Sequence, residues 1–194
     1  PVITHDYKLN GAAIRGFDGK FIGEQETKVT SLHIEELKGF DIGRLDQHSD
    51  YGRRFPEQAQ LDGVHIPRLS ELLYLVSQPK YQHVCLMLEL KSVPAHSSNR
   101  EALKKFISMV VCEVQKSDLA NRTLLHSFDW VLLTECKKQF RDMPTSFLTQ
   151  LKQHTDNIGE ETPLHLTTDF SLSQTSVPDE VKKAGGELWC PHFK

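Results

Sequence analysis

Glu89 and Lys91 stand two residues apart at the end of an apolar run, HVCLMLEL, at 83–90. A nearly continuous run of this length is typical of a strand buried on both faces. Because successive side chains of a strand point to opposite faces, the two charged groups share one face. A carboxylate there can bind a hard divalent cation, and a lysine beside it can hold a phosphate oxygen. A structural ion pair at the strand end is the alternative that the spacing leaves open.

His5 is the second candidate for chemistry, since the β-favouring residues V-I-T at 2–4 predict a strand and His5, followed by Asp6, stands where that strand gives way to a loop. An imidazole titrates near neutrality and can donate a proton to a departing alkoxide. A histidine of an exposed loop is the alternative. His126, at the end of another apolar segment, is a weaker candidate. None of the 10 histidines forms an H-x-x-x-H pair.

Several other kinds of site are excluded by their missing motifs. The sequence has no G-x-S-x-G elbow, no G-x-x-x-x-G-K-[ST] loop and no G-x-G-x-x-G fingerprint. Its four cysteines lie in or beside apolar segments and form no C-x-x-C pair; they are Cys85, Cys112, Cys136 and Cys190. This pattern predicts buried free thiols in a reducing compartment and argues against zinc.

Alternating strands and helices are predicted to position these groups. Strands are expected at 83–90, 123–128, 145–149 and from 187, with helices after Pro67 and at 99–117, 130–140 and 177–184. Such alternation indicates right-handed βαβ units and a parallel sheet. Asp129 is expected to cap the helix that follows it. The expected buried side of the long helix consists of Ala102, Phe106, Met109, Val110 and Val114.

Residues 8–65 differ from the rest of the chain. They are rich in Gly, Asp and Gln, carry turn signals such as F-D-G-K at 17–20, and contain one weak helical patch at 31–40. The region therefore looks like an insertion carried on the sheet scaffold.

Composition narrows the class of protein and of partner. The chain has 194 residues, a net charge of −3, and 38% hydrophobic residues, which suits one sizeable globular core. The mild acidity argues against nucleic acid as the main partner. Lysine pairs at 104–105, 137–138 and 182–183 fall on predicted helices and are expected to form solvated helix faces. No apolar run approaches the roughly 20 residues of a membrane span.

Seven short motifs, in this order, resemble the glycerophosphodiester phosphodiesterase family. They are PVITHD (1–6), ELKGFDIGR (36–44), FPEQ (55–58), DGVHIPRLSELL (62–73), LELK (88–91), LLHSFDW (124–130) and AGGELWCP (184–191). Each match is short, but the seven occur in one order across nearly the whole chain, which makes the resemblance specific.

The resemblance implies an α/β fold of the TIM (β/α)8-barrel type, in the phosphodiesterase superfamily. Residues 1–194 would form a partial phosphodiesterase domain, with 8–65 as the small inserted region. The family's histidine-arginine-glycine strand and its glutamate-x-aspartate pair would precede Pro1, and further strands would follow Lys194. We therefore expect an internal piece of a barrel, incomplete at both ends and inactive when isolated, because a full barrel has about 250 residues.

The implied activity is metal-dependent hydrolysis of glycerophosphodiesters to glycerol 3-phosphate and an alcohol, in phospholipid and glycerol metabolism. By resemblance, His5 is an acid/base catalyst, Glu89 binds Ca²⁺ or Mg²⁺, and Lys91, Phe128 and Trp189 contact the small-molecule substrate. One departure concerns the segment after the His-Asp pair: arginine and threonine are common there in the family, whereas this chain has N-G-A-A at 10–13.

Two other functional classes stay open. One is a catalytically dead relative that binds phosphodiesters or a protein, and the other is a related barrel phospholipase that acts on intact lipid. The cysteine pattern favours the cytoplasm. A periplasmic or secreted location stays open because a leader could precede Pro1, and the sequence leaves the oligomeric state open as well.

Overall fold

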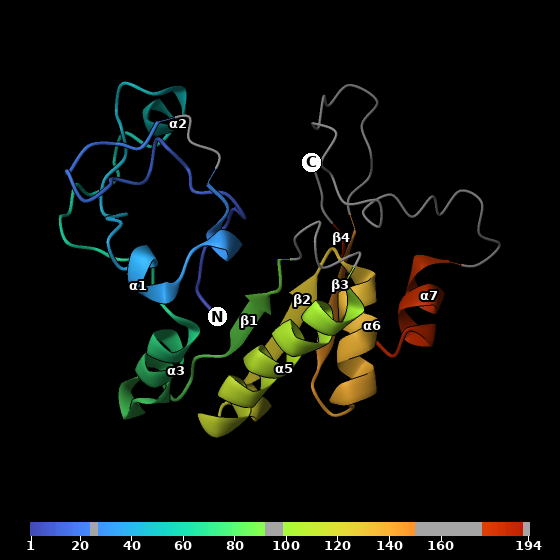
Figure 1. The fold of residues 1–194 in the computed structure, drawn as a ribbon. Helices are drawn as coiled ribbons and strands as arrows, with labels where there is room; N and C mark the ends of the chain where they lie inside the picture. The colour runs from blue at the N-terminus through green and yellow to red at the C-terminus, as the bar shows by residue number, and fades with distance from the viewer. Residues whose placement is uncertain (24–26, 92–98, 150–175, 192–194) are drawn as a thin grey trace. The chain divides into compact units, whose positions relative to one another are not determined.

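The computed structural model describes residues 1–23, 27–91, 99–149 and 176–191 (Figure 1). It divides into two compact units, one formed by Val2–Leu69 and the other by Ser70–Lys194 together with Pro1. Each unit is described by itself.

The larger unit is built on a four-stranded parallel sheet. Its strands are β1 (Leu86–Glu89), β2 (Thr123–Ser127), β3 (Thr145–Thr149) and β4 (Leu188–Pro191). They are ordered β1-β2-β3-β4, so that each strand pairs with the next one along the chain. The parallel α/β sheet predicted from the sequence is therefore confirmed.

Helices connect these strands as predicted: α5 (Arg100–Lys116), α6 (Trp130–Gln139) and α7 (Val177–Lys183), with the 3-10 turn η3 (Ala120–Arg122) before β2. Helix α3 (Leu69–Ser77) and the 3-10 turn η2 (Pro79–Tyr81) precede β1. Helix α5 packs beside α6, α6 contacts β2 and β3, and α7 contacts β4 (Figure 1). The lysine pairs at 104–105, 137–138 and 182–183 do lie on these helices, but the expected solvated face is wrong for Lys137, whose side chain is 12% exposed and pairs with Glu187.

Side-chain caps explain where three of the helices begin. Asn99 accepts a hydrogen bond of 3.0 Å from the backbone N–H of Ala102, at the start of α5. Asp129 accepts one of 3.1 Å from Leu132 at the start of α6, as predicted. Ser176 caps α7, which has a proline in its first turn.

The buried face of α5 differs from the predicted one. The buried residues are Leu103, Ile107, Val110, Val111 and Val114. The prediction was right for Val110 and Val114 and wrong for Met109, which is 44% exposed; Ala102 and Phe106 are only partly buried. Leu103, Ile107 and Val111, spaced four apart, form a continuous apolar stripe about one residue around the helix from the predicted side.

The cysteines are free, as expected, but only Cys136 is buried. The prediction of burial was wrong for Cys85, Cys112 and Cys190, which are exposed. They stand before β1, on the outer side of α5 and in the edge strand β4, where an adjacent apolar residue does not guarantee cover. Burial raises the pKa of the Cys136 thiol to about 11, so this thiol stays protonated at neutral pH.

The smaller unit has its own apolar cluster and little regular structure. The cluster consists of Leu9, Ile14, Val29, Leu37 and Ile66. Its helical segments are short: η1 (Val29–Ser31), α1 (Ile34–Leu37) and α2 (Asp50–Arg53). The turn predicted at 17–20 is present: the N–H of Gly16 donates to the carbonyl of Lys20 at 2.9 Å, and Gly19 has a φ of 74°.

The opening segment is not the strand that its residues predicted. Val2 forms a single antiparallel bridge with Arg68, and the N–H of Ile3 donates to the carbonyl of Pro67 at 2.8 Å. Ile3 is 38% exposed, so the segment has no well-buried apolar face to stabilise a longer ladder.

Replacing the cap of α6 should measurably destabilise the larger unit. We expect Asp129→Ala to lower the free energy of unfolding by about 1 kcal/mol, because it removes the bond to Leu132. Asp129→Asn keeps an acceptor oxygen and should lose much less. Urea unfolding of both variants checks this, and equal losses would contradict the capping role.

Candidate functional site

Hydrogen bonds at the carboxyl ends of β1 and β2 hold the two strands in register. The Ser127 hydroxyl donates to the carbonyl of Leu90 at 2.7 Å, and the N–H of Leu90 donates to the carbonyl of His126 at 2.8 Å. The N–H of Asp129 donates to the same Ser127 hydroxyl at 3.0 Å. One buried serine therefore ties the end of β1 to the end of β2 and to the start of α6.

Glu89 and Lys91 lie together at this end of β1, on one face as predicted. Lys91 Nζ is 2.8 Å from Glu89 Oε1, and the side chains of Lys91 and Glu89 are 35% and 27% exposed, respectively. The ion pair fits the structural alternative. It also fits a binding site, because both side chains are partly open to solvent and a phosphate bound with a cation can draw on both charges.

His126 is the neighbour of Glu89 on β2, where the strand register pairs the two residues. Its side chain is partly buried, and its Nδ1 has no hydrogen-bond partner among the described residues. Burial holds the pKa of His126 below its ordinary value, with Glu89 opposing this shift and Lys91 adding to it. From the sequence, His126 was the weaker histidine candidate because its position beside Glu89 depends on the pairing of β1 with β2. That pairing joins segments far apart in the sequence, so no local motif reports it.

His5 lies in the smaller unit and is 83% exposed. Its Nδ1 is 2.8 Å from Asp6 Oδ1, and the Thr4 hydroxyl bonds to the Asp6 carbonyl at 3.3 Å. When Nδ1 donates to Asp6, Nε2 is the ring nitrogen left for other partners. Asp6 can therefore orient the His5 ring in the way that a carboxylate orients an acid/base histidine.

Phe128 and Trp189, the two aromatic residues predicted to contact the substrate, lie in different parts of the larger unit. Phe128 follows β2 directly and is partly buried. Trp189 lies in β4, is 40% exposed, and donates to the Thr149 hydroxyl at 2.9 Å. The register pairs Trp189 with Phe147, and Phe147 with Ser127, so these side chains share one face. Glu89 and His126 occupy the opposite face, and the structure does not bring Trp189 to it.

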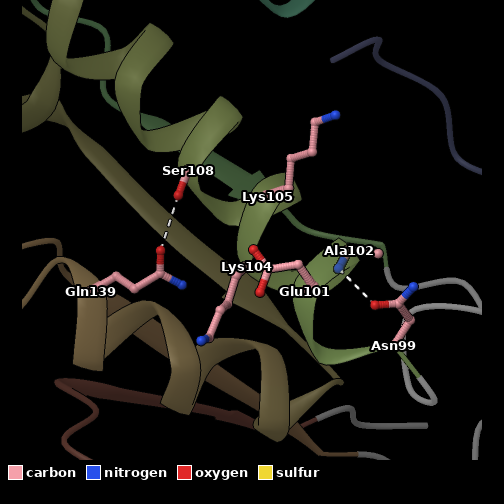
Figure 2. Close-up of a pocket in the computed structure, with 7 residues that line it drawn as sticks. All are labelled: Asn99, Glu101, Ala102, Lys104, Lys105, Ser108 and Gln139. Atoms are coloured by element: carbon pink, nitrogen blue, oxygen red, sulfur yellow. Dashed lines mark hydrogen bonds between the residues drawn. The ribbon is translucent and has the colours of Figure 1, made fainter.

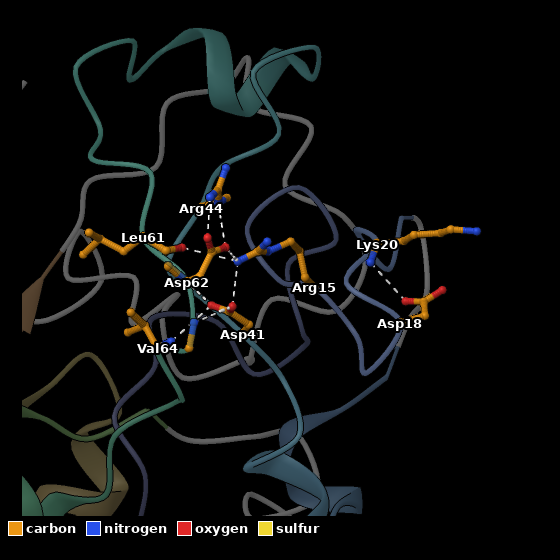
Figure 3. A network of polar contacts seen from close by, with 10 residues as sticks. Arg15, Asp18, Lys20, Asp41, Arg44, Leu61, Asp62 and Val64 are labelled. Carbon is orange, nitrogen blue, oxygen red and sulfur yellow. Dashed lines mark hydrogen bonds and ion pairs between the residues drawn. The ribbon is translucent and has the colours of Figure 1, made fainter.

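Arg15, the first arginine after the His-Asp segment, forms ion pairs within the smaller unit (Figure 3). Its guanidinium lies 2.6 Å from Asp41 and 2.7 Å from Asp62, and Arg44 also pairs with Asp62. Asp41 accepts further hydrogen bonds from the N–H groups of residues 43, 63 and 64, which lower the pKa of its carboxyl group. Arg15 therefore ties together three segments of the smaller unit, and two carboxylates already share its charge.

A shallow cavity of about 570 Å³ lies between α5 and α6 and includes none of the predicted site residues (Figure 2). Its polar lining includes Ser108, which donates to Gln139 at 3.0 Å and so links the two helices. It also includes Asn99, the cap of α5. Structural contacts therefore account for much of this lining.

Within the described ranges, no three His, Cys, Asp or Glu side chains group as a metal site would require. Glu89 offers one hard oxygen donor at the sheet end. Among the same residues, no helix combines the length and apolar character needed to cross a membrane.

Comparison with solved structures gives a specific match. A protein from Silicibacter pomeroyi DSS-3, assigned to the glycerophosphoryl diester phosphodiesterases, is 40% identical over 98% of this chain, with a TM-score of 0.85. A glycerophosphodiester phosphodiesterase from Parabacteroides distasonis is 19% identical over 98%, with a TM-score of 0.59, and shares the fold. The chain spans 60% and 54% of these two proteins. The resemblance predicted from the seven motifs is confirmed.

Neither protein-family models nor curated proteins give a match to this chain.

The arginine network of the smaller unit predicts an unusual titration. Hydrogen bonds from Arg44 and then Arg15 lower the pKa of Asp62 to about 2. Since an unfolded aspartate has a pKa of about 3.9, this interaction stabilises the fold above that pH and is lost as the pH falls toward 2. We expect ¹³C NMR to find the Asp62 carboxyl titrating near 2, and nearer its ordinary value in Arg44→Met. Unchanged titration in that variant would exclude Arg44 as the cause.

Proposed function

We propose, from its resemblance to the glycerophosphodiester phosphodiesterase family, that this chain forms part of an enzyme that hydrolyses glycerophosphodiesters to glycerol 3-phosphate and an alcohol. The observation that carries the proposal is the Glu89–Lys91 pair at the carboxyl end of β1. In parallel α/β folds this end of the sheet is where ligands bind and catalysis takes place.

We further propose that the sheet is part of a TIM barrel. The strands follow one another without the reversal of order found in doubly wound sheets. The face that carries Glu89 also carries Met87 and Leu188, which are 54% and 50% exposed. Large apolar side chains on a sheet face favour burial, and further barrel strands would supply it.

Glu89 is the residue that would hold a divalent cation, Ca²⁺ or Mg²⁺. Magnesium is usually bound through one or two carboxylates, with waters and substrate phosphate completing its shell, so a single glutamate at a phosphate site fits. When bound, such an ion neutralises the charge of the nonbridging phosphate oxygens. Lys91 would place a compact positive charge beside the same phosphate. Its ammonium group would then interact with the phosphate as well as with Glu89, and its ion pair with Glu89 would weaken.

His5 would act as the general acid for the leaving alcohol. Asp6 holds Nδ1, so Nε2 is the atom that donates the proton. An alkoxide is a poor leaving group, and a positioned acid is typically worth about 100- to 10,000-fold on such a step.

The setting in glycerol and phospholipid metabolism is part of the same proposal. We also propose a cytoplasmic location, because three exposed free thiols suit a reducing compartment.

Removing the carboxylate of Glu89 should remove metal-dependent turnover. In the protein as its organism makes it, we expect Glu89→Gln to weaken Mg²⁺ binding by at least about 10-fold and to abolish hydrolysis at limiting metal. Calorimetric Mg²⁺ titration and a glycerophosphocholine assay check this. Glu101→Gln, on the exposed start of α5, is the matched control. Unchanged metal affinity in Glu89→Gln would refute the ligand assignment.

The role of His5 predicts a dependence on the leaving group. His5→Ala should slow a substrate with an alkyl leaving group by about 100-fold or more, and an activated 4-nitrophenyl diester far less, because the nitrophenolate needs no proton. His48→Ala, which removes another exposed histidine of the same unit, should change neither rate. Equal losses of kcat on both substrates would exclude proton donation by His5.

A further inference from the structure

Three polar residues form one row across the sheet at the Glu89 site. The register pairs Glu89 of β1 with His126 of β2, and His126 with Ser146 of β3. Paired residues of parallel strands point to the same face, and neighbouring strands lie about 4.8 Å apart. The row therefore runs from Glu89 across two neighbouring strands, a distance of about 10 Å, which is enough for a small alcohol to lie along it.

Two atoms of this row are buried without a hydrogen-bond partner in the described part of the chain. They are His126 Nδ1 and the hydroxyl oxygen of Ser146, whose residue is 1% exposed. Buried polar side-chain atoms are nearly always hydrogen-bonded, so an unpartnered pair in one row needs an explanation.

The buried hydroxyls on the opposite face of β2 and β3 are all paired. Thr123 donates to the carbonyl of Leu119 at 2.9 Å, Ser127 to that of Leu90 at 2.7 Å, and Thr145 to the carboxylate of Glu187 at 3.0 Å. Among the buried polar side chains of β2 and β3, the atoms without a hydrogen-bond partner therefore lie on the face that carries Glu89; the other two such atoms in the described chain, Arg15 Nε and Glu113 Oε2, are not on these strands.

The chemistry of the two groups favours an alcohol as their partner. A serine hydroxyl both donates and accepts, and a ring nitrogen does one or the other according to tautomer. Phosphate oxygens only accept, and Lys91 already offers them a charged donor. A hydroxyl group of the ligand both donates and accepts, so it can satisfy Ser146 and His126 together.

We propose that His126 and Ser146 form a hydroxyl-binding subsite that positions a hydroxyl-bearing alcohol portion of the phosphodiester beside Glu89 and Lys91. This inference rests on the proposed function and adds two specificity-determining residues to it. A polyol ester should use the subsite, whereas a diester without free hydroxyls should not.

The test compares two substrates in the protein as its organism makes it. Ser146→Ala and His126→Leu should each lower kcat/KM for glycerophosphocholine by about 3- to 10-fold, the value of one ordinary hydrogen bond. Both should leave methyl 4-nitrophenyl phosphate, which has no hydroxyl, within about 2-fold of wild type. His83→Leu, in the exposed turn before β1, is the control for the histidine. Equal losses on both substrates would overturn the subsite and leave the phosphodiesterase activity standing.

A stability measurement separates the subsite from a structural role. Ser146→Ala should leave Tm unchanged or higher, because the hydroxyl it removes has no partner among the described residues. Thr145→Val should lower Tm, since it breaks the bond to Glu187. A fall in Tm of Ser146→Ala equal to that of Thr145→Val would overturn the inference.

A binding measurement does not depend on turnover. In ¹⁵N spectra of the histidine rings, glycerol 3-phosphate should shift the His126 nitrogens and inorganic phosphate should not. If the wild type hydrolyses neither diester, the proposed function fails and this spectrum decides the subsite: a selective shift supports it, and no shift, or an equal shift with phosphate, overturns it.

Discussion

The bond from the Ser127 hydroxyl to the Leu90 carbonyl is the contact on which the site depends. Together with the backbone bond from the N–H of Leu90 to the carbonyl of His126, it holds the register of β1 on β2 at the end where the polar groups gather. A slip by one residue would turn Glu89 to the helix-covered face and separate it from His126. The same serine accepts from the N–H of Asp129, which caps α6, so the start of the helix and the end of the strand are set together.

Two groups of polar residues differ in how fully they are bonded. Arg15, Asp41 and Asp62 hold the smaller unit together through ion pairs with one another and hydrogen bonds to the backbone, although Arg15 Nε has no hydrogen-bond partner among the described residues. The groups at the carboxyl end of the sheet can make further interactions. Glu89 and Lys91 are partly exposed, and His126 Nδ1 and the Ser146 hydroxyl are buried without hydrogen-bond partners in the described chain. Buried polar groups without partners have a cost in stability, and this is the observation on which the proposed ligand site rests.

The features that could be predicted from the sequence are those that depend on residues close together along the chain. Strand β3 was predicted with its observed bounds because Pro144 precedes a short run with β-favouring residues. The cap at Asp129 and the pairing of Glu89 with Lys91 are also local patterns. Trp189 and His126 could not be placed, because their positions depend on pairing between strands far apart in the sequence. The opening V-I-T segment misled because β propensity stabilises a strand only where a neighbouring strand or core covers it.

The central claim is that Glu89 and Lys91 form a cation and phosphate site. The most direct measurement is a crystal structure of the protein, as its organism makes it, with Mn²⁺ and glycerol 3-phosphate, using the anomalous signal of manganese to locate the ion. The account predicts a manganese peak bonded to a Glu89 oxygen, with the phosphate in contact with Lys91 Nζ. A manganese peak elsewhere, with the 2.8 Å Glu89–Lys91 pair intact and no phosphate beside it, would contradict the account.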